Sequence, residues 1–202
     1  MADPLRIRLP FLGDRHYLHG STLFEALLHY SQGVPPLDFK FKGFITSNML
    51  ELRTGKEPEL NALSPVATLT WGEERDCICA LELPAEHPIE SIPLPEDELM
   101  AAMPFADDRV TYDKPWPMGF ADTLFCLLKK LELQYKANVG GQWLFGGMQL
   151  TSLPRKDAPI SAVKDRLLPQ CRLLRMQLTA DGVPFGVAYT SWVPNDKMQP
   201  GN

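Results

Sequence analysis

One segment of the chain is apolar on nearly every side of a helix, a second is rich in apolar positions, and strand-like segments follow each of them. The first segment spans residues 22–30 and carries Leu23, Phe24, Ala26, Leu27, Leu28 and Tyr30. A helix with this pattern is surrounded by other structure. Thr22 and Glu25 fit the T-x-x-E capping box, so the helix is predicted to begin there. Gly33 and the two prolines after it predict its end.

Alternation of apolar and polar residues predicts strands around this helix. Residues 5–12 predict a strand broken by a proline, and residues 38–52 predict one long or bulged strand. The polar segment 53–64 predicts a loop. Residues 66–71 and 76–83 predict two paired strands joined by a turn.

The same order of elements returns after a segment rich in proline and acidic residues. Residues 84–108 contain five prolines, which predicts a linker with a short helix at 96–103. The elements predicted beyond it are a strand at 110–112, a helix capped by Asp122 or Thr123, a strand at 142–152, an irregular connection at 153–169, and a hairpin of 171–179 and 183–193. Asp181-Gly182 is a strong turn signal for this hairpin.

The two predicted helices align with each other. Ser21-Thr22-Leu23-Phe24 falls on Asp122-Thr123-Leu124-Phe125, and Phe44 and Phe145 keep the same offset. This predicts an internal duplication: an N-terminal repeat at 1–83, the linker at 84–108, a C-terminal repeat at 109–195 and a flexible tail at 196–202.

Composition narrows the class of protein. The chain has 202 residues, of which 45% are hydrophobic and 22% charged, with a net charge of -5, which is ordinary for a folded soluble protein. Without a basic stripe, nucleic acid is not an expected partner. No signal peptide and no apolar run of about 18 residues is present, so a cytoplasmic protein without a membrane span is expected. Four cysteines, Cys77, Cys79, Cys126 and Cys171, lack a paired metal-binding spacing and are predicted to be buried thiols, with no metal.

One apolar helix followed by antiparallel strands, present twice, resembles the hot-dog fold, in which a curved sheet wraps a central helix. The predicted fold class is therefore α+β: a double hot dog of two β-α-β-β-β repeats, with antiparallel sheets each wrapping a central helix. Two copies pair edge to edge in that fold. Sheet edges left free could support a homo-oligomer.

The helix start of the first half resembles that of hydroxyacyl-carrier-protein dehydratases. In that family a Pro-Gly precedes a catalytic Glu-Ala by four residues, and Gly20 and Glu25-Ala26 fit this spacing. His19 replaces the proline, and the position of the family's catalytic histidine falls on Phe11.

The second half is similar to hot-dog thioesterases. Val110 to Asp113 and Met118-Gly119-Phe120 look like the opening of that family. Its usual carboxylate falls on Trp116, with Asp113 a few residues away. Segments 141–144 and 172–188 look like the closing strands of acyl-CoA thioesterases.

These resemblances imply an acyl-thioester substrate, carried by CoA or an acyl carrier protein, that is hydrolysed or dehydrated without another cofactor. A carboxylate or histidine near the helix start would move protons, and backbone N–H groups there would polarise the carbonyl. The residues expected to act are the carboxylates Glu25 and Asp122, the base His16 or His19, and the substrate-contacting Gly20, Asp113, Trp116 and Met118. If the halves pair as the fold implies, the histidine would face Asp122.

Other interpretations stay open. Glu25 and Asp122 could serve only to cap helices, the two histidines could bond the loop or water, and Trp116 and Met118 could fill the core. The missing dyad histidine favours a non-enzymatic acyl-ligand or protein-interaction module with a degenerate active site. A third alternative is a two-sheet α+β interaction protein without the hot-dog fold.

Overall fold

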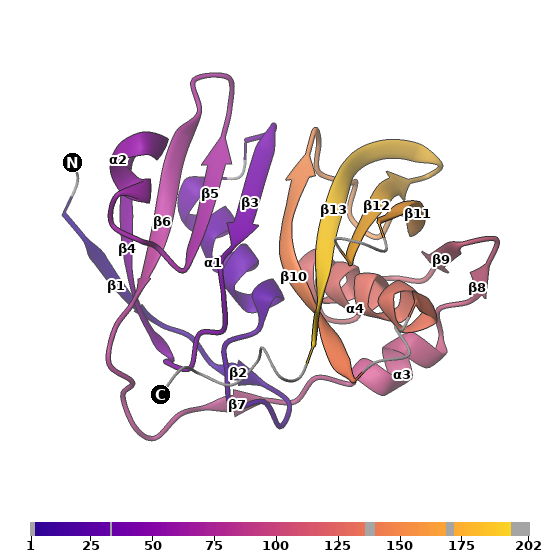
Figure 1. Cartoon of the computed structure of the whole chain (residues 1–202), viewed down its shortest axis with the longest axis horizontal. Coiled ribbons are helices and arrows are strands. Elements are labelled where there is room, and N and C mark those ends of the chain that lie inside the picture. Colours follow the sequence, from indigo (N-terminus) through magenta and orange to yellow (C-terminus); the bar gives the residue numbers. More distant parts are fainter. Residues whose placement is uncertain (1–2, 33, 136–139, 169–171, 195–202) are drawn as a thin grey trace. The chain divides into compact units, whose positions relative to one another are not determined.

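The computed structural model describes residues 3–32, 34–135, 140–168 and 172–194 (Figure 1). It divides into two compact units, the first formed by Met1–Glu96 with Gln149–Leu153 and the second by Asp97–Met148 with Pro154–Asn202. Each unit combines a helix of 12 or 13 residues with antiparallel strands. Cys171 and the predicted tail at 196–202 lie outside the described residues.

The sheet of the first unit is antiparallel. Its strands lie in the order β1 (Leu5–Arg8), β4 (Met49–Lys56), β6 (Asp76–Glu82), β5 (Ala67–Trp71) and β3 (Leu37–Phe41). A separate parallel pair joins β2 (Phe11–Leu12) to β7 (Ser91–Ile92). The prediction that segments 66–71 and 76–83 pair is confirmed.

Helix α1 (Gly20–Ser31) packs on this sheet through its apolar side chains. Leu23, Phe24 and Leu27 are fully buried, and the ring of Phe24 lies 5.2 Å from that of Phe39 on β3. The helix begins at Gly20, with His19 as the N-cap residue, so the capping box predicted from Thr22 and Glu25 is wrong. Thr22 already lies inside the first turn, because the buried Gly20 and Ser21 continue the helix backward toward the loop.

The segment 38–52 forms two strands, β3 and β4, where one was predicted. The chain leaves the sheet between them, and the backbone N–H groups of Thr46 and Ser47 donate to Glu82 Oε1 at 2.8 and 2.9 Å. A side chain thus satisfies donors that a continuous strand would have paired with a neighbour. Ile45 is buried in this interval, and its carbonyl accepts a hydrogen bond from Leu18 N.

The predicted loop at 53–64 is also wrong. Strand β4 continues to Lys56, and the short helix α2 (Glu57–Asn61) follows. Leu60 of α2 is buried against Cys77, Cys79 and Leu81 of β6. The polar composition of the segment predicted a loop. The segment is polar because α2 packs on the sheet through Leu60, while its other side chains face outward.

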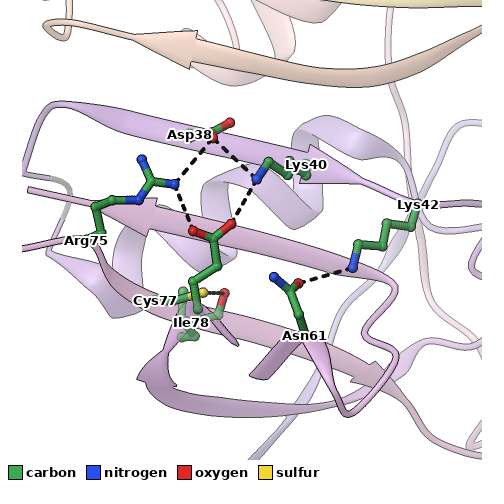
Figure 2. Close-up of polar contacts among 8 residues, drawn as sticks. Asp38, Lys40, Lys42, Asn61, Arg75, Cys77 and Ile78 are labelled. Atoms are coloured by element: carbon green, nitrogen blue, oxygen red, sulfur yellow. Dashed lines mark hydrogen bonds and ion pairs between the residues drawn. The ribbon is translucent and has the colours of Figure 1, made fainter. Parts of the chain in front are cut away.

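Ion pairs connect α2 to β3 and to the turn between β5 and β6. Glu57 accepts hydrogen bonds from Lys40 Nζ at 2.9 Å and from Arg75 Nη2 at 2.8 Å. Both cations also approach Asp38, at 3.5 and 3.9 Å (Figure 2). The hydrogen bonds from Arg75 and Lys40 lower the pKa of Glu57 to about 2.

Replacing Glu57 by glutamine is expected to lower the free energy of unfolding at pH 7 by about 0.5–1 kcal/mol, since the two cations are half exposed and screened by solvent. The folded pKa of Glu57 lies below its ordinary value, so its stabilisation is present above pH 4.5 and is lost as the pH falls toward 2. Urea unfolding at pH 7 and pH 3 measures this. The exposed Glu73→Gln is the control, and a Glu57→Gln deficit that does not shrink at pH 3 would contradict the prediction.

The second unit has its own antiparallel sheet. The strand order is β10 (Gly141–Leu150), β13 (Val183–Pro194), β12 (Leu173–Ala180), β11 (Ile160–Leu168), β9 (Arg109–Tyr112) and β8 (Phe105–Ala106). The predicted hairpin is confirmed as β12 and β13. Its turn has positive φ at Asp181 (49°) and Gly182 (79°), as a type I′ turn requires.

Helix α4 (Phe120–Glu132) packs on this sheet, preceded by α3 (Glu96–Ala101) and followed by the 3-10 turn η1 (Leu133–Tyr135). The predicted short helix at 96–103 is thereby confirmed. The N-cap residue is Gly119, at a φ of 107°, and not Asp122 or Thr123. Thr123 Oγ1 instead donates to Gly119 O at 2.7 Å from inside the first turn.

The connection predicted at 153–169 contains strand β11. Its first three residues are buried and its last four are exposed, with an irregularity between Lys164 and Arg166. Because one end of β11 is buried and the other is exposed, its sequence does not alternate between apolar and polar residues. The strand was therefore predicted as an irregular connection. Among the described residues, each unit therefore has four sheet strands after its long helix, where the predicted β-α-β-β-β repeat has three.

The two sheets also differ in strand order. In the second unit β11, β12 and β13 follow one another as a meander. In the first unit β6 lies between β4 and β5, so the chain passes over β6 before it enters β5. Helix α2 lies in this crossing segment and covers β6.

Candidate functional site

The start of α1 brings a histidine and a serine together. His19 is the N-cap residue, with an extended backbone, and its Nδ1 lies 2.7 Å from Ser21 Oγ. Ser21 is fully buried and His19 is half-buried. This contact fixes the orientation of the imidazole ring beside the first turn of the helix.

The same turn offers backbone donors. The first N–H groups of any α-helix lack intrahelical acceptors, and here they lie next to Gly20, which has no side chain to block an approaching ligand. The hydroxyl of Thr22 is buried and has no hydrogen-bond partner. A buried hydroxyl without a hydrogen-bond partner costs free energy. The Thr22 hydroxyl could therefore donate a hydrogen bond to an acceptor atom of a bound ligand.

An ion pair anchors the loop that leads into α1. Arg15 Nη2 lies 2.6 Å from Glu96 Oε2, and Arg15 Nη1 donates to Leu12 O at 3.2 Å. Burial alone would lower the pKa of Arg15, but the charge of Glu96 and its hydrogen bond outweigh this and raise it. The ion pair therefore anchors the loop at Arg15, four residues before His19.

The other predicted residues of the first unit differ in how they lie relative to the start of α1. His16 is exposed in the loop. Glu25 is exposed on α1, one turn beyond Ser21 and on the same side of the helix. Phe11, at the position of the dehydratase histidine, is buried in β2.

In the second unit, aromatic side chains surround the start of α4. The ring of Trp116 lies 5.4 Å from that of Phe120, which lies 6.0 Å from that of Phe185. Trp116 N donates to Asp157 Oδ1 at 2.8 Å, while the buried Trp116 Nε1 has no hydrogen-bond partner. Trp116 can therefore donate its indole N–H to an acceptor of a ligand.

Asp122 is buried in the first turn of α4, where the helix dipole favours a carboxylate. Met118 is half-buried two residues before the helix, and Asp113 is exposed after β9. Burial first, and then the charge of Asp113, raises the pKa of Tyr112.

Three polar groups were not predicted as part of a site. The spacing of Ser21 from His19 is a local signal in the sequence. The Thr22 hydroxyl was predicted to cap the helix. Nothing was predicted for Glu132, at the end of α4, where burial raises the pKa to about 8. No sequence signal marks this environment, because Thr190, which lies beside Glu132, is far away in the chain.

Among the described residues, no group of three or more His, Cys, Asp or Glu side chains could hold a metal ion. In the same part of the chain, no helix has the length and apolar character needed to cross a membrane. Cys77, Cys79 and Cys126 are buried free thiols, as predicted. Burial raises the pKa of Cys77 to about 12, which makes it a poor nucleophile.

No protein-family model matches the chain, and no curated protein matches it. Solved structures do. An acyl-ACP thioesterase from Bacteroides thetaiotaomicron is 9% identical, with a TM-score of 0.52 and coverage of 95% of this chain and 97% of that one. A 12:0-ACP thioesterase from Umbellularia californica is 9% identical (TM-score 0.47, coverage 95% and 98%). A dehydratase domain from Pseudomonas fluorescens is 13% identical (TM-score 0.45, coverage 93% and 92%).

The similarity to the Bacteroides thetaiotaomicron structure supports a conclusion about the fold alone. It spans nearly the whole of both chains and agrees with the antiparallel sheets and long helices described above. The chain has the hot-dog fold.

Proposed function

We propose that this protein binds an acyl thioester of CoA or of an acyl carrier protein and hydrolyses it. The observation that carries the proposal is the contact of His19 Nδ1 with Ser21 Oγ at the start of a buried helix. The names of the structurally similar proteins, two of them acyl-ACP thioesterases, support the same substrate class.

His19 is the proposed general base. In the tautomer whose Nδ1–H donates to Ser21, the lone pair lies on Nε2. Nε2 takes a proton from water as the water oxygen bonds to the carbonyl carbon. The carbon–sulfur bond then breaks, and the protonated imidazole returns the proton to the leaving thiolate. The acid and the free thiol are the products.

Glu25 and the first turn of α1 complete the proposed site. Backbone N–H groups beside Gly20 polarise the carbonyl, where negative charge develops during attack. Glu25 stabilises the imidazolium or orients water. In the second unit, Asp122, Trp116, Met118 and Asp113 at the start of α4 are a separate set of candidate residues, and no cofactor besides the acyl carrier is proposed. His16 is the alternative base, acting from the exposed loop.

Hydrolysis of a panel of acyl-CoAs and acyl carrier proteins tests this proposal. His19→Gln and Glu25→Gln are each expected to lower kcat by about 100-fold or more, as removal of an acid–base group does, and Asp122→Asn tests the candidate residues of the second unit separately. His16→Gln separates the two candidate bases, and His29→Gln, exposed in the last turn of α1, is the matched control. A measurable wild-type rate that all of these variants retain would refute the assigned residues.

A non-catalytic acyl binder is the second candidate. Phe11 and Trp116 stand where the resembling enzyme families carry a histidine and a carboxylate. No turnover of any thioester, together with saturable thermal stabilisation by an acyl-CoA, would favour this candidate. Dehydration of a hydroxyacyl thioester is measured in the same panel.

A further inference from the structure

The inner face of the second sheet carries polar groups that the proposed reaction does not use. Ala188, Thr190 and Trp192 alternate on β13 and are all buried. On β10, Phe145 contacts Phe125 of α4 at 4.7 Å, so the side of β10 that holds Phe145 faces this helix. Trp143 lies two residues earlier on that same side.

These residues form one cluster. The rings of Trp143 and Trp192 lie 5.6 Å apart in an edge-to-face arrangement. Thr190 precedes Trp192 by two residues on the same face of β13, and its hydroxyl lies beside the carboxyl of Glu132, the last residue of α4. The end of α4 and two strands therefore contribute to one group of polar side chains.

The cluster has more hydrogen-bond donors than acceptors. The indole Nε1 atoms of Trp143 and Trp192 are both buried and have no hydrogen-bond partner. The Thr190 hydroxyl approaches Glu132 closely enough to lower its pKa but does not reach full hydrogen-bond geometry. An indole N–H can only donate, so each tryptophan leaves a donor that requires an external acceptor.

We propose that this cluster binds the carboxylate of an aliphatic acid, with the two indole N–H groups and the Thr190 hydroxyl as donors and Glu132 as an acid that shares its proton with the ligand. A carboxylate offers about four acceptor positions, enough for all four donors. The buried Ala188 and the half-buried Phe145, on the same strand faces as Thr190 and Trp143, offer apolar surface for an alkyl chain. This inference does not depend on the thioester site at the helix starts.

The charge balance favours a single negative charge. Burial raises the pKa of Glu132 to about 8, so Glu132 is a neutral donor at pH 7. Lys129, one turn earlier on α4, is the cation that acts on it. The other inner-face residues described on the packed strands are Val110, Tyr112, Ile160, Ala162, Leu174, Met176 and Leu178, of which Tyr112 is titratable and donates to Pro115 O. Tyr135, Asp108 and Lys164, near the end of α4, are engaged with one another.

Calorimetric titration of the full chain with decanoate tests the proposal, with decanol as the uncharged ligand of equal chain length. Decanoate is expected to bind at pH 6.5 at least tenfold more tightly than decanol. Trp192→Phe and Trp143→Phe keep an aromatic ring but remove the donor, so each is expected to weaken decanoate binding about tenfold or more. Trp71→Phe, on β5 of the first unit, is the control and is expected to change nothing.

The pH dependence identifies the role of Glu132. Above about pH 8, the affinity of the wild type is expected to fall about tenfold per pH unit, because ionised Glu132 repels the ligand. Glu132→Gln keeps a donor that cannot ionise, so it is expected to bind decanoate at pH 9.5 as it does at pH 6.5.

Three results would overturn the proposal: equal binding of decanol and decanoate, unchanged affinity in both tryptophan variants, or a crystal structure grown with decanoate that shows only water at the indole N–H groups. If Trp192→Phe fails to fold, as judged by circular dichroism, the decanoate affinity of Trp143→Phe alone tests the proposal. Because thioester hydrolysis is assayed separately, failure of this site and failure of the proposed function give different results.

Discussion

Glu132→Gln is expected to make the protein more stable at pH 8 than the wild type, by a few kcal/mol. Burial raises the folded-state pKa of Glu132 from 4.5 to about 8, with the Thr190 hydroxyl and Lys129 opposing the shift. Glu132 also ends α4, where the helix dipole disfavours a negative charge. Glutamine has nearly the same shape and no charge to bury.

The sign follows from proton binding. Between pH 4.5 and about 8 the folded chain holds a proton on Glu132 that the unfolded chain has released. The free energy of unfolding of the wild type therefore falls as the pH rises through this window, by about 1.4 kcal/mol per pH unit and at most about 5 kcal/mol in all. The variant lacks this slope.

Urea unfolding from pH 5 to pH 9 measures the difference, read as the gap between the two stability curves. Glu98→Gln, an exposed carboxyl on α3, is the control and is expected to follow the wild-type curve. Parallel stability curves for the wild type and Glu132→Gln from pH 5 to pH 9 would show that Glu132 is solvated and that its pKa is not raised. That result would also remove the proton-sharing role proposed for it in carboxylate binding.

Gly141→Ala is expected to destabilise the protein by about 2–4 kcal/mol. A Cβ atom at this position would lie 2.5 Å from Val193 O and 2.8 Å from Trp192 Nε1. The indole could move aside, but the carbonyl belongs to the backbone of β13 and can yield only by distorting the sheet. The clash therefore cannot be relieved by a change of rotamer.

Gly146→Ala provides a matched control on the same strand. Its added Cβ would meet Tyr189 O at 3.6 Å, an ordinary contact, so its free energy of unfolding is expected to change by less than about 0.5 kcal/mol. Thermal and urea unfolding of both variants checks the pair. Equal losses in the two variants would mean that the close packing of β10 against Trp192 does not contribute to stability.

Much of the local structure could be read from the sequence. The first long helix was predicted from residues that are apolar on nearly every side, the second from its apolar positions after a polar start, and the β12–β13 hairpin from Asp181-Gly182. These patterns are short-range, since they depend on which faces of one segment are buried. The internal duplication inferred from the aligned helices stays a prediction, and the different strand orders of the two units were not foreseen.

The candidate site was predicted in part. The sequence directs attention to the helix starts because glycine, histidine and carboxylates gather there, and their role as a site stays a prediction. The contact between His19 and Ser21 was not predicted, because the helix was expected to begin at Thr22 and its true start moves Ser21 into the first turn. A shift of two residues in a helix boundary was enough to change which side chains meet.

By itself, the sequence determined that this is an α+β protein with two buried helices, each followed by antiparallel strands. The spacing of apolar residues along each segment is enough to predict which of its faces is buried. Only the tertiary structure decided that α2 covers β6, that β11 is a strand, and that Glu132 lies beside Thr190 in surroundings that raise its pKa. Burial and pairing of this kind depend on residues far apart in the chain. Their solvent exposure is set only when the sheet and the helix pack together.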